Sequence, residues 1–382
     1  MRWSVLLACA VLSACGTQPV APLRAGTFFN DAAFRAPSVP VHADIFALND
    51  PMRRFIHAEI DPQMRRKGSV EGLIDALQNR TRLKLEYDSA VTRTAAEAFD
   101  ARAGNCISLV IMTAALAKEL GLPVYYQQVY AEETWSRDGG ILFRSGHINM
   151  VLQPRFGETN RSSDGGRQAT IDFLPPEDVR GYRTRPIEER TIVAMFMNNR
   201  AAESLARGRL DDAYWWAREA IARDDGFLDA YNTLGVVYHR HGNLGEAERV
   251  YRALLERKPD NATAISNLAA VLTTAGQPQA AQAQLRKLQS IEPYPPFHFL
   301  DQAELALKRG DFRTAISLFN KELARDPYYH AAHFGLASAY YQLGDFASAR
   351  EHLATALENS TTRRDHELYA AKLDRLRSSH IH

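Results

Sequence analysis

Residues 102–121, RAGNCISLVIMTAALAKELG, determine how the first half of the chain must fold. Four polar residues interrupt the apolar run that begins at Ile107: Ser108, Thr113, Lys118 and Glu119. A helix that is hydrophobic on nearly every side is buried in the centre of a domain instead of lying on its surface. Gly121, followed two residues later by a proline, predicts where this helix ends. We therefore expect a central helix with the other elements packed around it.

Cys106 lies at the predicted start of this helix. Asn105, the residue before it, is a preferred N-cap residue, which places the thiol at the positive end of the helix dipole. A thiolate is favoured in that position. A cysteine there is either a small core residue or a nucleophile, and the helix alone does not decide between the two.

The N-terminal residues 1–15 have the pattern of a secretory signal, with a basic start, an apolar run and small residues at the end. The sequence LSAC at residues 12–15 resembles the lipobox of bacterial lipoproteins, in which the cysteine becomes the lipidated first residue. This resemblance implies a lipid anchor on Cys15. Gly16, which replaces the Asp of the inner-membrane pattern, implies delivery to the outer membrane, facing the periplasm of the bacterial cell envelope. An ordinary N-terminal helix is the alternative.

The number of cysteines adds to this interpretation. Of three cysteines, Cys9 would leave with the signal and Cys15 would carry lipid, so Cys106 would be the free thiol of the mature chain. An unpaired thiol in an oxidising compartment is a liability unless it is buried or used.

Composition excludes some classes of function. The 382 residues predict two or three domains, and 46% hydrophobic with 24% charged residues is ordinary for a soluble globular chain. The net charge of +1 gives no electrostatic case for nucleic acid as a partner. After residue 15, no apolar run approaches the ~18 residues that a membrane span needs. We expect the lipid anchor to be the only link to a membrane.

The region between the signal and the repeats divides into two parts. Residues 16–45 are rich in Pro and Ala without periodicity, which predicts a flexible tether. Residues 46–185 contain short amphipathic helices, the central helix, and three strand regions at 124–130, 141–152 and 169–174, where the hydrophobic period changes from 3.6 to 2. A buried helix followed by an antiparallel sheet predicts an α+β domain.

The second half of the chain, residues 192–361, repeats itself. Glycine recurs every 34 residues at five positions: Gly208, Gly242, Gly276, Gly310 and Gly344. Alanine recurs with the same step: Ala213, Ala247, Ala281, Ala315 and Ala349. These positions resemble the tetratricopeptide repeat, which implies paired helices stacked into an all-α solenoid of five repeats. Residues 362–382 would then form a capping helix.

The same resemblance implies a groove for a protein or peptide partner. The fifth position of each repeat unit normally faces the concave side, and it is occupied here by five residues: Asn198, Asn232, Ser266, Leu300 and Phe334. The change from polar to apolar side chains along the array favours an amphipathic partner.

A nucleophilic thiol needs a base within hydrogen-bond reach and a group that orients this base. His147 follows a glycine at the start of a strand, whereas the two other histidines of this half lie in the tether and on a helix. Asp172 lies between Ile171 and Phe173 on the next strand, where a carboxylate is costly unless it is paired. An imidazole from the adjacent strand would pair it. Asn149 could position His147 or an oxyanion, or could simply face solvent.

Three motifs in this order resemble the transglutaminase-like, papain-type cysteine domain over roughly residues 80–180: RAGNCIS at 102–108, GHINMV at 146–151 and TIDF at 170–173. The resemblance implies that Cys106 attacks an amide carbonyl, His147 transfers the proton and Asp172 orients the imidazole. An acyl-thioester would then pass to water or to an amine, with no cofactor and no metal. The substrate would be a protein or peptide.

Other interpretations stay open. Cys106 could be an inert buried thiol, and catalytically silent members of this superfamily exist, so the chain could be a scaffold for envelope assembly. A Cys-His-Asp zinc site would have only three ligands and lacks the C-x-x-C spacing of many zinc sites. For the catalytic interpretation we expect the Cys106 sulfur and a ring nitrogen of His147 to lie within ~3–4.5 Å, with Asp172 at the other nitrogen.

Overall fold

The computed structural model describes residues 25–38, 41, 44–78, 83, 85–138, 141–155, 168–173, 183–294, 297–360 and 362–378. The predicted signal peptide and Cys15 lie outside these residues. Within them, no helix combines the length and the apolar character that crossing a bilayer requires.

The first half of the chain is built around the predicted central helix, α5 (Cys106–Glu119). All of residues 107–117 are buried, and the chain leaves the helix through Gly121 at a φ of 69°. Two 3-10 turns, Ala25–Phe28 and Asp31–Ala33, come first in the described chain. Between residues 50 and 101 follow α1 (Asp50–Phe55), a π-helical turn (Ile56–Ile60), α2 (Asp61–Lys67), α3 (Ser69–Gln78), β1 (Glu86–Tyr87) and α4 (Ala95–Ala101). Strand β2 (Ala103–Gly104) leads directly into α5 and pairs in parallel with β1.

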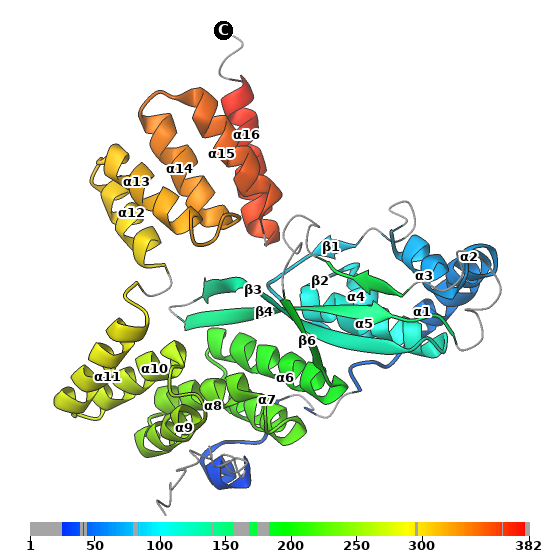
Figure 1. Cartoon of the computed structure of the whole chain (residues 1–382), viewed down its shortest axis with the longest axis horizontal. Coiled ribbons are helices and arrows are strands. Elements are labelled where there is room, and N and C mark those ends of the chain that lie inside the picture. The colour runs from blue at the N-terminus through cyan, green and yellow to red at the C-terminus, as the bar shows by residue number, and fades with distance from the viewer. Residues whose placement is uncertain are drawn as a thin grey trace, which may run out of the picture.

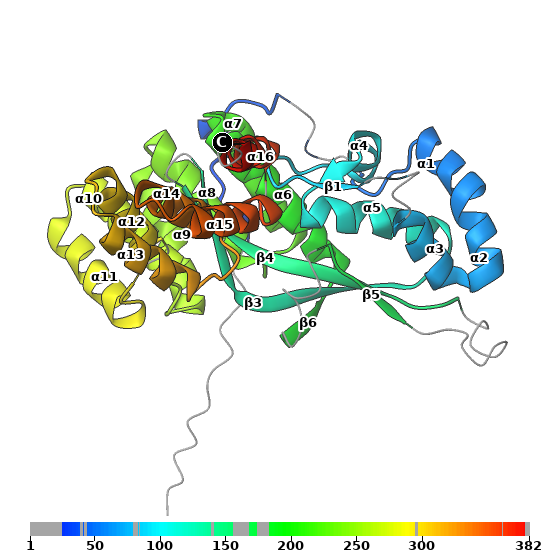
Figure 2. The same cartoon turned by 90° about the horizontal axis from the view of Figure 1, so that it is seen from above.

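An antiparallel sheet packs against α5 (Figures 1 and 2). In the described residues it has the order β5-β4-β3-β6, formed by β3 (Val124–Asp138), β4 (Ile141–Leu152), β5 (Ala169–Ile171) and β6 (Arg183–Ile187). Val129 is paired with His147 and Met150 with Ile171, so His147 lies on the strand next to β5. Asp172 comes directly after β5, whereas the sequence placed it within a strand over 169–174. The fourth strand, β6, was not predicted, because its exposed sequence RTRPI has no alternation and contains a proline, as edge strands can.

Five helix pairs follow in the described part of the second half, as the 34-residue spacing predicts. The pairs are α6 (Glu189–Ala206) with α7 (Leu210–Arg223), α8 (Leu228–His241) with α9 (Leu244–Arg257), α10 (Ala262–Thr274) with α11 (Pro278–Ile291), α12 (His298–Lys308) with α13 (Phe312–Leu323), and α14 (His330–Gln342) with α15 (Phe346–Glu358). Helix α16 (Arg363–Ser378) caps the last pair. Small residues let the helices approach closely, because a Cβ on Gly235 would lie 2.5 Å from the ring of Tyr251.

The array is interrupted between the third and fourth pairs, which corrects the expectation of one continuous solenoid. Among the described residues, one buried hydrophobic cluster extends from Phe28 to Ala281, and separate clusters begin at Phe297. Leu285 on α11 and Leu305 on α12 are each 50% exposed. In Figure 1, α12–α16 form a group of their own, apart from α6–α11. The linker sequence PYPPF at 293–297 explains the break, since prolines do not continue a helix and Phe297 has a φ of 65°.

Residues 25–38 are docked on the first two repeats, which corrects the prediction that residues 16–45 are a flexible tether throughout. The ring of Phe34 stacks on Tyr214 with centroids 4.0 Å apart, and the Tyr238 hydroxyl donates a hydrogen bond to the Phe28 carbonyl. The hydroxyl of Tyr214 donates to Asp31, 2.6 Å away. A Pro- and Ala-rich segment shows no period, but its few aromatic residues are sufficient to anchor it.

Candidate active site

The turn before α5 presents Cys106 at the first position of the helix. Helix α4 ends at Arg102 in the left-handed conformation, at a φ of 50°. Gly104 then approaches α5 so closely that a Cβ would lie 2.7 Å from the Cβ of Ser108. The Asn105 side chain accepts a hydrogen bond from the Ser108 amide, as the predicted N-cap should. The thiol is therefore held at the positive end of the helix dipole.

The structure brings together Cys106, His147 and Asp172. The Cys106 Sγ lies 3.4 Å from His147 Nδ1, and His147 Nε2 lies 2.7 Å from Asp172 Oδ1. The first distance falls in the range expected from the sequence, and the carboxylate is at the other ring nitrogen. Because the cysteine and the aspartate bind opposite nitrogens, the three groups form a row with the imidazole in the middle.

Asn149, two residues after His147 on β4, supports the carboxylate. Its Nδ2 donates to Asp172 Oδ2 at 3.2 Å, while its own Oδ1 is buried and has no hydrogen-bond partner among the described residues. Both oxygens of Asp172 therefore accept a hydrogen bond. Asn149 acts on the aspartate and makes no such bond to the imidazole.

The electrostatics of the row favour a charged imidazole. The side chains of His147 and Asp172 are only 8% and 12% exposed. Burial lowers the pKa of His147, but the hydrogen bonds to Asp172 and Cys106 outweigh it and raise this pKa to about 10. An imidazolium at neutral pH, beside a thiol at a helix N-terminus, can stabilise a thiolate. One contact acts in the opposite sense, since the Ile148 carbonyl lies 3.0 Å from Sγ and accepts a hydrogen bond from a neutral thiol.

Tyr87 belongs to the site but was not identified from the sequence. Its hydroxyl lies beside the backbone N–H of Cys106. The residue as a whole is 38% exposed, but burial of its hydroxyl end and the nearby Cys106 raise the pKa of Tyr87, so the hydroxyl is neutral and retains a proton to donate. The sequence LKLEY at 83–87 alternates as a strand does, and nothing in that pattern marks the tyrosine as functional.

Within the described residues, no group of three His, Cys, Asp or Glu side chains is arranged to hold a metal ion. The row formed by Cys106, His147 and Asp172 explains this for the site itself, because the imidazole separates the other two groups.

The predicted groove residues divide into two sets. Asn198, Asn232 and Ser266 are half-buried, and Asn232 accepts a hydrogen bond from Asn267 at 2.9 Å. Leu300 is only 3% exposed, within the hydrophobic cluster that begins at Phe297, so it lines no open groove.

Phe334 is also covered, because its ring stacks on Tyr369 of the capping helix with centroids 4.9 Å apart. The apolar end of the predicted groove is therefore a contact within the chain.

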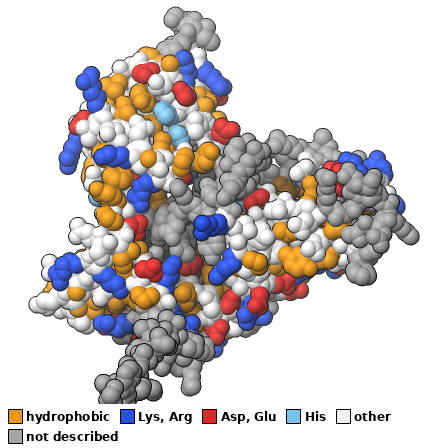
Figure 3. All heavy atoms as spheres, viewed as in Figure 1, with side chains coloured by type: hydrophobic (Ala, Val, Ile, Leu, Met, Phe, Trp, Pro, Cys, Tyr) orange, Lys and Arg blue, Asp and Glu red, His pale blue; other side chains and the backbone are white. Residues whose placement is uncertain are grey.

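On the face shown in Figure 3, described basic and acidic side chains are interspersed with hydrophobic ones.

Comparison with known proteins agrees with the helix pairs. Tetratricopeptide repeat models match residues 200–262, 238–296 and 300–363. The second half of the chain carries tetratricopeptide repeats. The cellulose synthase operon protein C of Pseudomonas fluorescens is 30% identical over 139 residues, which are 34% of this chain and 11% of that protein. The chain thus spans about a ninth of the length of this relative.

Three solved structures illustrate the similarity to known chains. MamA is 18% identical, with 45% of this chain and 93% of that chain covered and a TM-score of 0.26. YrrB, described as a TPR protein with an unusual peptide-binding site, is 22% identical, with 47% and 92% covered and a TM-score of 0.25. PilF of Pseudomonas aeruginosa is 19% identical, with 50% and 87% covered and a TM-score of 0.28.

Proposed function

We propose that this chain is a thiol-dependent amide-bond hydrolase or acyltransferase whose tetratricopeptide repeats bind a protein or peptide partner. The observation that carries the proposal is the row of Cys106, His147 and Asp172, with the sulfur at 3.4 Å and the carboxylate at 2.7 Å from opposite nitrogens of one buried imidazole. A nucleophile, a base and an orienting group in this order are the parts that acyl transfer needs. The resemblance of the three motifs to transglutaminase-like cysteine domains supports the same chemistry.

The reaction follows from the geometry. The Cys106 thiolate attacks the carbonyl carbon of an amide, and the negative charge moves to the carbonyl oxygen. The backbone N–H of Cys106 and the neutral hydroxyl of Tyr87 lie together and are the donors available to that oxygen. The His147 imidazolium gives its Nδ1 proton to the leaving amine, and an acyl-thioester remains. Water or an amine then attacks the thioester, His147 takes the proton from it, and the thiolate is restored.

Asp172 keeps the imidazole in place during both steps. Its hydrogen bond to Nε2 directs Nδ1 toward the sulfur and stabilises the imidazolium that the resting state and the first step require. The Asn149 amide holds the second carboxylate oxygen, so the aspartate cannot rotate away without losing this bond.

We further propose that the chain is a lipoprotein of the bacterial cell envelope, anchored through Cys15 to the outer membrane and facing the periplasm. The LSAC sequence at residues 12–15 supports this location. Mass spectrometry of the mature chain should find a lipid on Cys15, and the variant Cys15→Ser should lack it. A mature chain without lipid on Cys15 would overturn the anchor.

Alkylation of the native protein with iodoacetamide tests the chemistry. At pH 7, Cys106 in the full chain should react at least tenfold faster than in the urea-unfolded chain, and His147→Ala should remove this difference. C106S is the matched control for labelling elsewhere. If native Cys106 does not label while the unfolded chain does, the thiol is inert and the proposal is wrong.

A scaffold without catalysis is the second candidate, and one observation favours it. The Ile148 carbonyl at 3.0 Å from Sγ is an acceptor for a neutral thiol, which a structural cysteine would be. The repeats would then carry the whole function as a binding surface for envelope proteins. A scaffold predicts that C106A leaves every phenotype of the cell unchanged, whereas an enzyme predicts that C106A behaves like a deletion.

A further inference from the structure

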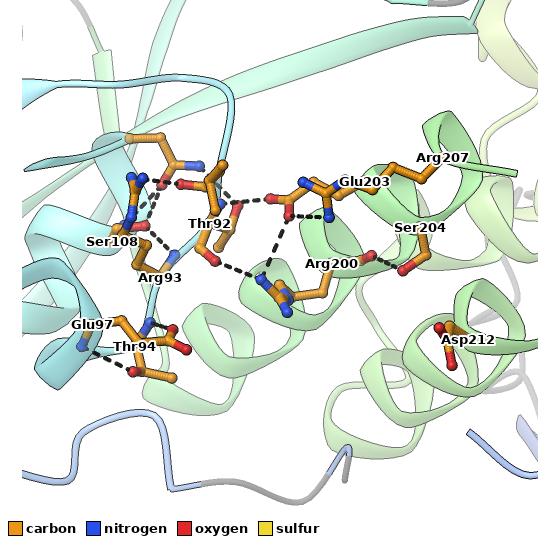
Figure 4. Close-up of polar contacts among 12 residues, drawn as sticks. Thr92, Arg93, Thr94, Glu97, Ser108, Arg200, Glu203, Ser204, Arg207 and Asp212 are labelled. Atoms are coloured by element: carbon orange, nitrogen blue, oxygen red, sulfur yellow. Dashed lines mark hydrogen bonds and ion pairs between the residues drawn. The ribbon is translucent and has the colours of Figure 1, made fainter. Parts of the chain in front are cut away.

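A buried polar contact links the first repeat to the loop beside the active-site cysteine (Figure 4). Thr92, only 1% exposed, lies in the loop before α4, and its amide donates to Glu203 Oε1 at 2.6 Å. Its carbonyl accepts from Arg200 Nη1 at 3.1 Å. Arg200 and Glu203 are three residues apart on one face of α6, so the first repeat holds both backbone groups of Thr92.

The side chain of Thr92 is hydrogen-bonded to Asn105, the residue that caps α5. Its Oγ1 accepts a hydrogen bond from Asn105 Nδ2 at 2.8 Å. The Oδ1 of Asn105 accepts from both the amide and the hydroxyl of Ser108, at 3.0 and 2.7 Å. Every polar atom of the Asn105 side chain is therefore engaged, and Cys106 is the next residue. Two hydrogen bonds separate Glu203 of the repeats from the residue that caps the cysteine's helix.

Glu203 is a largely buried carboxylate of α6. Its side chain is 14% exposed, and burial raises its pKa even though Thr92 and two arginines act against this. The arginine nitrogens of Arg200 and Arg207 lie 3.6 and 3.8 Å from Oε2, which compensates the buried charge only in part. The closest contact of Glu203 is the Thr92 amide, which lies outside the repeats.

We propose that Glu203 is a positioning residue for Cys106, so that the first repeat holds the nucleophile of the preceding domain in its reactive orientation. This inference rests on the proposed function of Cys106. Loss of the Glu203 contact leaves the Arg200 bond alone to hold the backbone of Thr92, and a more mobile Thr92 fixes Asn105 less firmly. The first turn of α5 is then less ordered. Its backbone N–H groups, which stabilise the thiolate, point less directly at Sγ.

The test compares matched variants of the full chain by the rate of iodoacetamide alkylation between pH 5 and 9. Glu203→Ala should react about fivefold more slowly at pH 7, the factor that corresponds to the loss of one N-cap. The pH at which its alkylation rate is half-maximal should rise. Glu203→Gln retains an oxygen that can accept from the Thr92 amide and should stay within about twofold of the unchanged chain.

Two further variants separate positioning from folding. Thr92→Val leaves the backbone contacts to α6 but removes the acceptor of Asn105, so it should slow alkylation as E203A does. Thr92→Ser retains the hydroxyl and should restore the rate. Glu219→Ala is the control, since Glu219 is a buried carboxylate of the same repeat that pairs with Arg223 on its own helix.

The outcomes distinguish this inference from the proposed function. If the unchanged chain shows no reactive Cys106, the proposed function fails. If that thiol is reactive but E203A and T92V alkylate with the rate and pH profile of the unchanged chain, Glu203 is structural and the inference fails. An equal slowing in E219A would also overturn it, because any damage to the repeat would then be sufficient.

Discussion

The variant Asp172→Asn tests how the imidazole of His147 is charged. The carboxylate accepts one hydrogen bond on each oxygen, from His147 Nε2 at 2.7 Å and from Asn149 Nδ2 at 3.2 Å. An amide of the same shape has a single acceptor oxygen and carries no charge. In D172N, one of the two donors therefore loses its acceptor, and the imidazolium loses its counter-charge.

The size of the effect follows from these contacts. A hydrogen bond to a charged group contributes about 1.5–3 kcal/mol, which corresponds to a factor of about ten to one hundred in the ratio of imidazolium to neutral imidazole. The pKa of His147, raised to about 10 in the native chain, should fall accordingly. The unsatisfied donor should also lower the free energy of unfolding by about 1–3 kcal/mol.

The sign of the pH dependence is determined by the raised pKa. The native chain binds the His147 proton more tightly than the unfolded chain, whose histidine titrates near 6.5. This contribution to stability is complete below pH 6.5 and is lost as the pH rises toward 10. D172N should lose much less stability over that interval.

A titration followed by NMR of histidine labelled with carbon-13 measures this pKa directly, with H147Q to assign the signal. Asn149→Ala is the control, because it leaves the charge of Asp172 at the imidazole, and the pKa of His147 should stay well above 6.5. A His147 signal that titrates near 6.5 in both the unchanged chain and D172N would refute the reasoning.

Three further predictions concern other parts of the chain. Phe34→Ala removes a ring stacked on Tyr214 and should destabilise the docked segment by about 3 kcal/mol; urea unfolding measures this, and an unchanged midpoint would show that the segment adds no stability. Gly104→Ala places a Cβ against the first turn of α5, so it should slow alkylation of Cys106 and lower the free energy of unfolding by about 1–3 kcal/mol. An unaltered alkylation rate would contradict the close approach of Gly104 to α5. Burial lowers the pKa of His333 and of His352, whose Nδ1 atoms are 3.2 Å apart, so the native state disfavours their protons and stability should fall as the pH drops below 6.5. Thermal unfolding at pH 5 and 7.5 tests this, and H352N should reduce the difference, because only His333 then remains; an equal stability of the unchanged chain at both pH values would contradict the prediction.

The sequence predicted those parts of the fold that a local pattern of residues determines without help from distant parts of the chain. A helix apolar on all sides must be buried, an asparagine before it caps it, and glycines at 34-residue spacing end the first helices of repeats. The site was predicted for a similar reason, since a carboxylate between two apolar strand residues, like Asp172, needs a partner.

The features that the sequence did not predict depend on contacts between residues far apart in the chain. A single sequence contains little information about such contacts. Tyr87 resembles any aromatic residue on a strand until its hydroxyl is found at the Cys106 amide. Glu203 resembles a solvated residue of a repeat helix until Thr92 is found against it. The break after α11 leaves the glycine spacing unchanged, because the period records the length of each repeat and not its packing on the next.

These contacts assign different roles to the two groups of repeats. In the described chain, one hydrophobic cluster includes the docked segment from Phe28, the central helix and the first three repeats as far as Ala281. Separate clusters hold the last two repeats and the capping helix, beyond the proline-rich linker. The first repeats are therefore a structural continuation of the domain that contains Cys106, to which α6 adds Glu203. Among the described residues, the last two repeats share no buried cluster with that domain, so the core around Cys106 does not depend on their packing.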